Sequence, residues 1–92
     1  MNNKTYNESI YEDADKYWVS SDMFIAATLI ALHHKLISIE WQDHRKATFI
    51  FKHSKSLTST VEQYFSDKLT LNPRELFDAQ RLLKSRLYVP NR

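Results

Sequence analysis

The chain has 92 residues and no glycine, whereas an average protein of this length contains about six. Glycine provides the positive φ angles and the close backbone approach that phosphate-binding loops, dinucleotide-binding turns, nucleophile elbows and calcium loops require. The absence of glycine therefore excludes these kinds of site. It leaves the fold class readable from the remaining pattern, and it leaves few motifs that identify a function.

The length and composition indicate one small folded domain. A single hydrophobic core usually organises roughly 100–150 residues, and a chain that is 42% apolar and 26% charged has a globular composition. The sequence contains no cysteine, which excludes disulfide frameworks, zinc fingers, thiol nucleophiles and iron–sulfur clusters.

Charge is distributed unevenly along the chain. The first 23 residues hold two lysines and five acidic residues, a balance of −3, and residues 24–92 hold eleven basic and six acidic residues, a balance of +5. No apolar run reaches the roughly 18 residues that cross a bilayer, and the first residues lack the apolar segment of a signal peptide. We expect a cytoplasmic protein with an acidic, partly disordered N-terminal arm at residues 1–15 and a single domain at residues 16–92.

A buried helix is predicted in the first half of the domain. Residues 23–32 are apolar almost all the way round, which a surface helix cannot be. Ser20-Ser21-Asp22 can cap its start, and residues 17–19 form a short β-prone cluster before the cap. We therefore expect a strand that leads into a central helix.

A β-hairpin follows. Residues 36–41 and 47–52 alternate between apolar and polar side chains around a polar loop at residues 42–46. The alternation puts Ile37, Ile39 and Trp41 on one face of the first strand. In the second strand it does the same for the three residues Ala47, Phe49 and Phe51.

Two further helices and one short strand complete the pattern. After a cap at Ser54 or Ser56, an apolar stripe runs along a helix and comprises Leu57, Val61, Tyr64 and Phe65. The alternating residues 68–71 are typical of an edge strand. Asn72, Pro73 and Glu75 then start a last helix that runs to about Tyr88, and its expected buried residues are Leu76, Phe77, Leu83 and Leu87. The β-α-β-β-α-β-α order predicts a compact α+β domain with a small antiparallel or mixed sheet and helices packed against it.

Several of these segments, between about Tyr17 and Tyr88, resemble a family of small domains of unknown function found in prokaryotes and their phages. The similar features are Trp18-Val-Ser-Ser-Asp22, the apolar helix, Leu36-x-x-Ile39-Glu40, Phe49-x-Phe51, Tyr64, Leu69-x-Leu71-x-Pro73 and Leu83-Lys84-x-x-Leu87-Tyr88. The resemblance implies a fold and brings no catalytic residues. Members of the family often have glycine after the first helix, where this chain has His33-His34, and histidine tolerates the left-handed region better than most residues.

Catalytic and metal chemistry is weakly indicated. The chain has four histidines, but His33 and His34 diverge on a helix, and His44 and His53 have no ligand set at metal-binding spacing. No nucleophile with an adjacent base is recognisable. We expect no metal, no cofactor and no enzymatic activity.

Basic residues in and after the hairpin and on the last helix are candidates for nucleic-acid contact, because phosphate binding requires lysines and arginines on one surface. The candidates are Arg45, Lys46, Lys52, Lys55, Arg81, Lys84 and Arg86. Their spacing does not show whether the two sets share a face. The alternative is that they are solvated side chains which complement a helix dipole or protect a sheet edge.

Two tryptophans and one short segment are candidates for protein contact. Partly exposed aromatic residues beside charge often anchor interfaces, and an edge strand can pair with another chain. The candidate partner-binding residues are Trp18, Trp41, Leu69 and Leu71. The alternative for both tryptophans is that they cover the ends of the sheet.

We therefore expect a non-catalytic binding module that docks on a protein or nucleoprotein complex. The family resemblance implies a phage or mobile-element factor, such as an inhibitor of host defence of the anti-CRISPR kind. Direct nucleic-acid binding through the hairpin and the last helix is the alternative. Homodimerisation through the edge strand is compatible with either.

Overall fold

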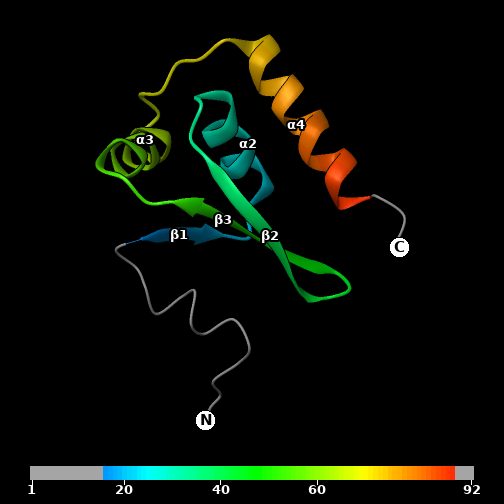
Figure 1. Cartoon of the computed structure of the whole chain (residues 1–92). Helices are drawn as coiled ribbons and strands as arrows, with labels where there is room; N and C mark the ends of the chain where they lie inside the picture. Colours follow the sequence, from blue (N-terminus) through cyan, green and yellow to red (C-terminus); the bar gives the residue numbers. More distant parts are fainter. Residues whose placement is uncertain (1–15, 89–92) are drawn as a thin grey trace.

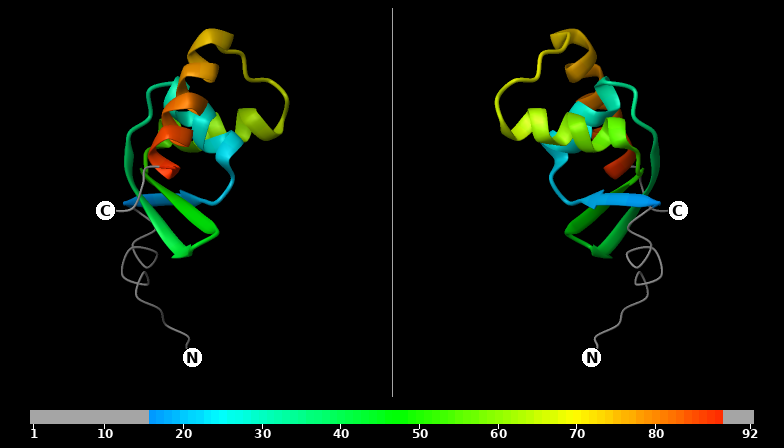
Figure 2. Two further views of the ribbon diagram at one scale, coloured as in Figure 1. Left: turned by 90° about the vertical axis from the view of Figure 1, so that its right-hand side faces the viewer. Right: turned by 90° about the vertical axis from the view of Figure 1, so that its left-hand side faces the viewer.

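The computed structural model describes residues 16–88. In chain order the elements are β1 (Tyr17–Ser20), α2 (Met23–Ala31), β2 (Leu36–Asp43), β3 (Lys46–Lys52), α3 (Lys55–Phe65) and α4 (Pro73–Leu87). The strands of this part of the chain form an antiparallel sheet in the order β1-β3-β2, and the helices lie on one side of it (Figures 1 and 2). The domain is α+β, as predicted. The predicted acidic arm at residues 1–15 lies outside the described residues.

The predicted hairpin is formed by β2 and β3. Ile39 pairs with Phe49 and Trp41 pairs with Ala47, so these four side chains share the face of the sheet that the helices cover. Phe49 and Phe51 are buried in the core. The prediction that Ala47, Phe49 and Phe51 share one face is confirmed.

A bulge changes which residues of β2 face the core. The register shifts between Leu36 and Ser38, which inserts one extra residue and reverses the alternation at this end of the strand. Leu36 packs against the core, whereas Ile37 is 42% exposed. The prediction that Ile37 lies on the same face as Ile39 and Trp41 was therefore wrong for Ile37.

The helix α2 is central to the core, as its apolar sequence predicts. Ala26, Ala27 and Leu29 are completely buried, and α2 packs between α3 and α4 above the sheet (Figure 1). The side chain of Asp22 caps the helix by accepting a hydrogen bond from the backbone N–H of Phe24 at 2.8 Å. Small side chains at Ala26 and Ala27 permit this close packing, since a helix surrounded by other elements has room only for short residues there.

Residues other than glycine form the helix ends that need positive φ. His33, with a φ of 72°, follows α2, and Asp67, with a φ of 60°, follows α3. At the end of α2, His34 N–H donates to the Leu29 carbonyl and His33 N–H donates to the Ile30 carbonyl, both at 2.9 Å. This pair of bonds is the Schellman pattern, in which the left-handed residue is usually glycine. His33 is therefore the residue that terminates α2.

The edge strand predicted at residues 68–71 is absent, so the observed order is β-α-β-β-α-α. The segment connects α3 to α4 on the helical side of the molecule, away from the sheet (Figure 1), and Leu71 packs against the core from this connection. An alternating apolar pair has the same pattern in a strand and in a loop that buries one side chain. The observed sheet edges are β1 and β2.

The starts of α3 and α4 agree with the sequence. Ser54 caps α3, and Asn72 caps α4 with Pro73 in its first turn. The predicted burial was wrong at two positions, because Phe65 is 70% exposed and Phe77 is 57% exposed. Both lie at the border of an apolar stripe, where rotation of the helix by part of a turn decides which residues reach the core.

Candidate partner-binding surface

The tip of the β2–β3 hairpin is the first part of the candidate surface. His44 and Arg45 form the turn, and Arg45 N–H donates to a carboxylate oxygen of Asp43 at 2.7 Å. The two turn residues have negative φ, so the hairpin lacks the glycine-dependent turn that strand twist favours. A register shift between Trp41 and Asp43 compensates, and the predicted five-residue loop is shortened to two residues.

The hairpin and the end of α4 enclose a cavity of about 340 Å³. Its lining residues come from four parts of the chain, namely Ser21, Met23, Trp41, His44, Arg45, Ala47, Phe49, Leu87 and Tyr88. The buried ring of Phe49 lies at its floor. Two of the other aromatic residues of the lining are exposed, Trp41 at 44% and Tyr88 at 76%. We call this cavity the hairpin–helix pocket.

The outer face of α4 extends from this pocket. Residues at helical spacing on this face are exposed and alternate between basic and aromatic, namely Arg74, Phe77, Arg81, Lys84 and Tyr88. Arg74, Phe77 and Arg81 also line an open hollow at the start of the helix. Arg81 forms an exposed ion pair with Asp78 at 3.1 Å, so part of its charge is neutralised. The face is therefore moderately basic and interrupted by large apolar side chains.

The structure separates the predicted protein contacts. Trp41 lies on the surface, at the hairpin–helix pocket. Trp18 is half-buried and packs against the core, with its ring edge toward Phe51 at a centroid distance of 6.4 Å. Leu69 and Leu71 are half-buried in the α3–α4 connection. The proposed strand pairing through Leu69 and Leu71 was therefore wrong.

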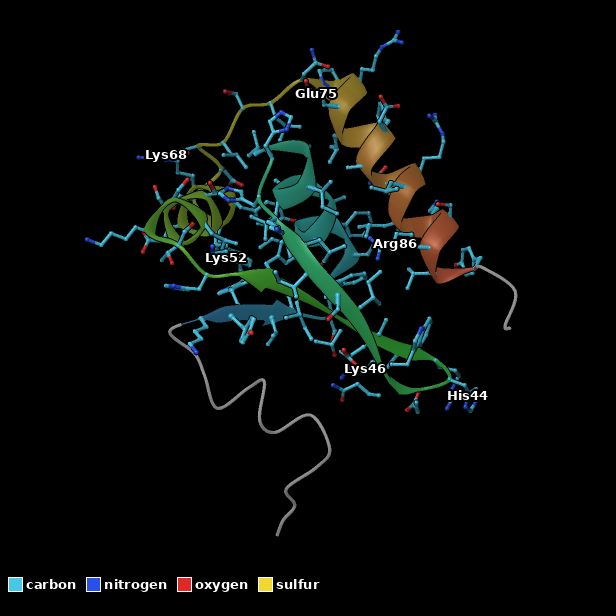
Figure 3. All side chains as sticks on the ribbon, in the orientation of Figure 1. His44, Lys46, Lys52, Lys68, Glu75 and Arg86 are labelled. Atoms are coloured by element: carbon cyan, nitrogen blue, oxygen red, sulfur yellow. The ribbon has the colours of Figure 1, made fainter. Side chains whose placement is uncertain are left out.

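The predicted nucleic-acid contacts divide between two ends of the molecule. Lys46 and Lys52 are the first and last residues of β3, a separation of about 20 Å at the rise of a strand, and Figure 3 shows them at opposite ends. Arg45 belongs to the end that includes Leu87 and Tyr88, and Lys84 and Arg86 are in the last turn of α4. Lys55 begins α3 at the end where β3 finishes.

Two lysines that sequence spacing did not single out join the group at Lys52 and Lys55. Lys52 N–H donates to the Lys35 carbonyl at 3.1 Å, and His53 N–H donates to the Lys16 carbonyl at 2.8 Å. Lys16 and Lys35 are far apart in sequence, and only the strand register brings them together. The pairing of a strand start with a strand end is the signal that could have found them.

The four histidines lie apart in function as well as in sequence. His33 ends α2 and His44 is in the hairpin turn. His34 Nε2 lies 3.1 Å from the Thr60 hydroxyl, and His53 Nε2 lies 3.2 Å from the hydroxyl of Thr58. Within residues 16–88, no group of three or more histidine and carboxylate side chains is placed to hold a metal ion.

Burial lowers the pKa of His34 below its ordinary value of 6.5. The Thr60 hydroxyl lies 3.0 Å from the Ser56 carbonyl and donates its single proton there. Its oxygen then accepts from His34, which assigns the ring proton to Nε2. The group is a structural contact between α2 and α3.

Residues 15–89 match the family described as domain of unknown function DUF5659. The match covers every helix and strand of the structure. The chain belongs to this family. No curated protein and no solved structure matches the chain.

Membership in DUF5659 agrees with the resemblance drawn from the sequence and leaves the function open. Within the described part of this DUF5659 domain, none of the helices has both the length and the apolar character needed to span a bilayer. The hairpin–helix pocket lies inside the matched region, since its lining runs from Ser21 to Tyr88. The pocket is thus formed by elements of the DUF5659 fold itself.

Proposed function

We propose that the domain is a non-catalytic binding module that docks on an acidic surface of a partner protein. The observation that supports this best is the hairpin–helix pocket, which combines the exposed Trp41 and Tyr88 with Arg45 at about 340 Å³. Aromatic and arginine residues around a pocket are the usual anchors of protein interfaces. The resemblance to prokaryotic and phage domains supports the narrower proposal that the partner is part of a host defence complex.

The composition of the surface favours a protein partner with acidic side chains. The pocket floor is apolar, with Met23, Phe49 and Leu87, and can accept one large apolar side chain. Arg45 at the rim and Lys84 on α4 complement carboxylates next to that side chain. Such an arrangement suits a peptide or loop in which apolar and acidic residues alternate.

The test is a pull-down from a prokaryotic lysate with the tagged full chain, after nuclease treatment. The site variant is Arg45→Glu with Tyr88→Ala. The matched control is Phe65→Ala with Lys68→Glu, which removes one exposed aromatic and one base at the end of α3. We expect the site variant to lose at least about tenfold in recovery of a specific protein, since hot-spot losses exceed 1.4 kcal/mol. Equal recovery with both variants would contradict the proposal.

Direct nucleic-acid binding at the same surface is the second candidate. It is supported by the position of Arg45 beside two exposed aromatic rings, because bases stack on aromatic side chains while basic residues contact phosphates. We expect Arg45→Glu with Lys84→Glu to reduce the salt dependence of oligonucleotide binding, measured by fluorescence anisotropy. An unchanged salt slope would remove both residues from a nucleic-acid site. Lys84 replaces Arg81 in this test because Arg81 already pairs with Asp78.

A further inference from the structure

Four lysines gather at the end of the sheet opposite the hairpin turn. Lys16 precedes β1, Lys35 precedes β2, Lys52 ends β3 and Lys55 begins α3. Tyr17 pairs with Lys52 in the sheet, and backbone hydrogen bonds join Lys52 to Lys35 and His53 to Lys16. All four lysines are exposed. We call this group the lysine end.

No carboxylate of the described chain neutralises most of this group. Within residues 16–88, Lys35, Lys52 and Lys55 form no ion pair, and the first turn of α3 contains no acidic residue. On the neighbouring strands the acidic residues lie elsewhere, with Asp22 after β1 and Asp43 at the hairpin turn. Exposed lysines without carboxylates nearby repel one another, by about 1 kcal/mol per close pair in water.

The missing negative charge stands directly before the lysine end in the sequence. Residues 8–15 contain four carboxylates, Glu8, Glu12, Asp13 and Asp15, and no basic residue. Because Lys16 is itself part of the lysine end, the chain enters the fold among these lysines. Asp15 is one residue away and Glu12 is four, within about 15 Å of chain.

This attachment favours the lysine end over the other basic surface. A short tether gives an effective concentration in the millimolar range for sites within its reach. Arg45 lies beyond the far end of β3, roughly 20 Å from Lys52. The last carboxylates before β1 are therefore within reach of Lys16, Lys35, Lys52 and Lys55, and Asp15 and Asp13 are too close to β1 to extend to Arg45.

We propose that the acidic segment of residues 8–15 binds the lysine end of its own chain and masks it from phosphate-bearing polymers such as nucleic acid. This is a device separate from the hairpin–helix pocket, and it does not depend on the proposed docking function. The segment and a nucleic-acid backbone present the same chemistry, a run of anionic oxygens, and so compete for the same lysines.

Paramagnetic relaxation in the full chain tests where the segment binds. The protein has no cysteine, so Ser9→Cys provides a single attachment site for a nitroxide. The enhancement is read at the amides of Lys35 and Lys55, and Arg81 and Lys84 report on the other basic surface. The comparison chain carries the same label and three neutralised acids, Glu12→Gln, Asp13→Asn and Asp15→Asn.

We expect neutralisation to lower the enhancement at Lys35 and Lys55 at least about twofold, since it removes the attraction and leaves the tether length unchanged. An unchanged enhancement at these lysines would overturn the proposal. A stronger enhancement at Arg81 and Lys84 than at Lys35 would also overturn it, because the segment would then occupy the surface of α4.

Oligonucleotide binding tests the masking. The probe is a fluorescent 20-nucleotide single strand, read by anisotropy at about 0.1 M salt. A matched control neutralises three acids of the body, Glu40→Gln, Glu62→Gln and Glu75→Gln, and so has the same net charge. We expect the arm variant to bind about tenfold more tightly than this control, and Lys35→Glu with Lys52→Glu to remove that gain. Equal binding by the arm variant and the control would show that net charge alone acts, and would overturn the proposal.

Discussion

At the scale of single residues, the lack of glycine has a structural solution that its absence alone does not reveal. His33 and Asp67 adopt positive φ after α2 and α3, and each ends its helix where glycine is usually found. The sequence narrowed the end of α2 to His33-His34, because histidine tolerates this region. It gave no comparable signal at Asp67, since a polar residue after a helix has the same pattern in many conformations.

We predict that His33→Gly stabilises the protein. A side chain in the left-handed region costs roughly 1 kcal/mol, and the backbone bonds to Leu29 and Ile30 do not involve the imidazole. The free energy of unfolding in urea should rise by about 1 kcal/mol. Ser59→Gly, at an exposed position inside α3, is the control and should lower it by roughly 0.5 kcal/mol. A loss of stability in His33→Gly would show that the imidazole makes a contact of its own.

The lowered pKa of His34 predicts how stability depends on pH. The unfolded chain binds a proton at its ordinary pKa of 6.5, and the folded chain binds it only at lower pH because burial disfavours the charged ring. The contribution of His34 is therefore complete above about pH 6.5 and is lost as pH falls below it toward the folded-state pKa.

Urea unfolding between about pH 5 and about pH 8 measures this dependence. His34→Asn should flatten the decline on the acidic side. Thr60→Val removes the hydrogen-bond partner and leaves the imidazole within the contact between α2 and α3, so the decline should remain. A steep acidic decline in His34→Asn would assign the pH dependence to other groups.

At the scale of helices and strands, the alternation and the caps predicted most elements, and packing decided the rest. The hairpin, the cap at Asn72 and the apolar α2 all agree with the sequence. The strand expected at Leu69 and Leu71 is a loop, because two alternating leucines also fit a connection that buries Leu71. The exposure of Phe77 depends on the rotation of α4, which local sequence does not determine.

The two tryptophans should differ in their effect on stability. Trp18 packs against the core beside Phe51, so Trp18→Ala should lower the free energy of unfolding by about 3 kcal/mol. Trp41 is already 44% exposed, so Trp41→Ala should cost roughly 1–2 kcal/mol. Chemical denaturation of the two variants makes the comparison. A larger loss in Trp41→Ala than in Trp18→Ala would return Trp41 to the core and weaken the proposed surface.

At the scale of the whole molecule, the basic residues form two separate ends rather than one stripe. Spacing along the chain suggested a hairpin set and a helix set without relating them. The structure joins Arg45 to the end of α4 around one pocket, and it leaves Lys52 and Lys55 with Lys16 and Lys35 at the other end. Neither arrangement could be predicted from sequence, because both depend on the strand register and on the packing of α4 across α2.

The most direct test of the docking proposal is to disable each half of the pocket separately in the nuclease-treated pull-down. Arg45→Glu changes only the hairpin, Tyr88→Ala changes only the end of α4, and Phe65→Ala is the exposed aromatic control. If the two halves form one binding surface, each of the first two variants alone should lose at least about tenfold in recovery of the same protein while Phe65→Ala retains it. Full recovery of that protein with either Arg45→Glu or Tyr88→Ala would contradict a shared surface.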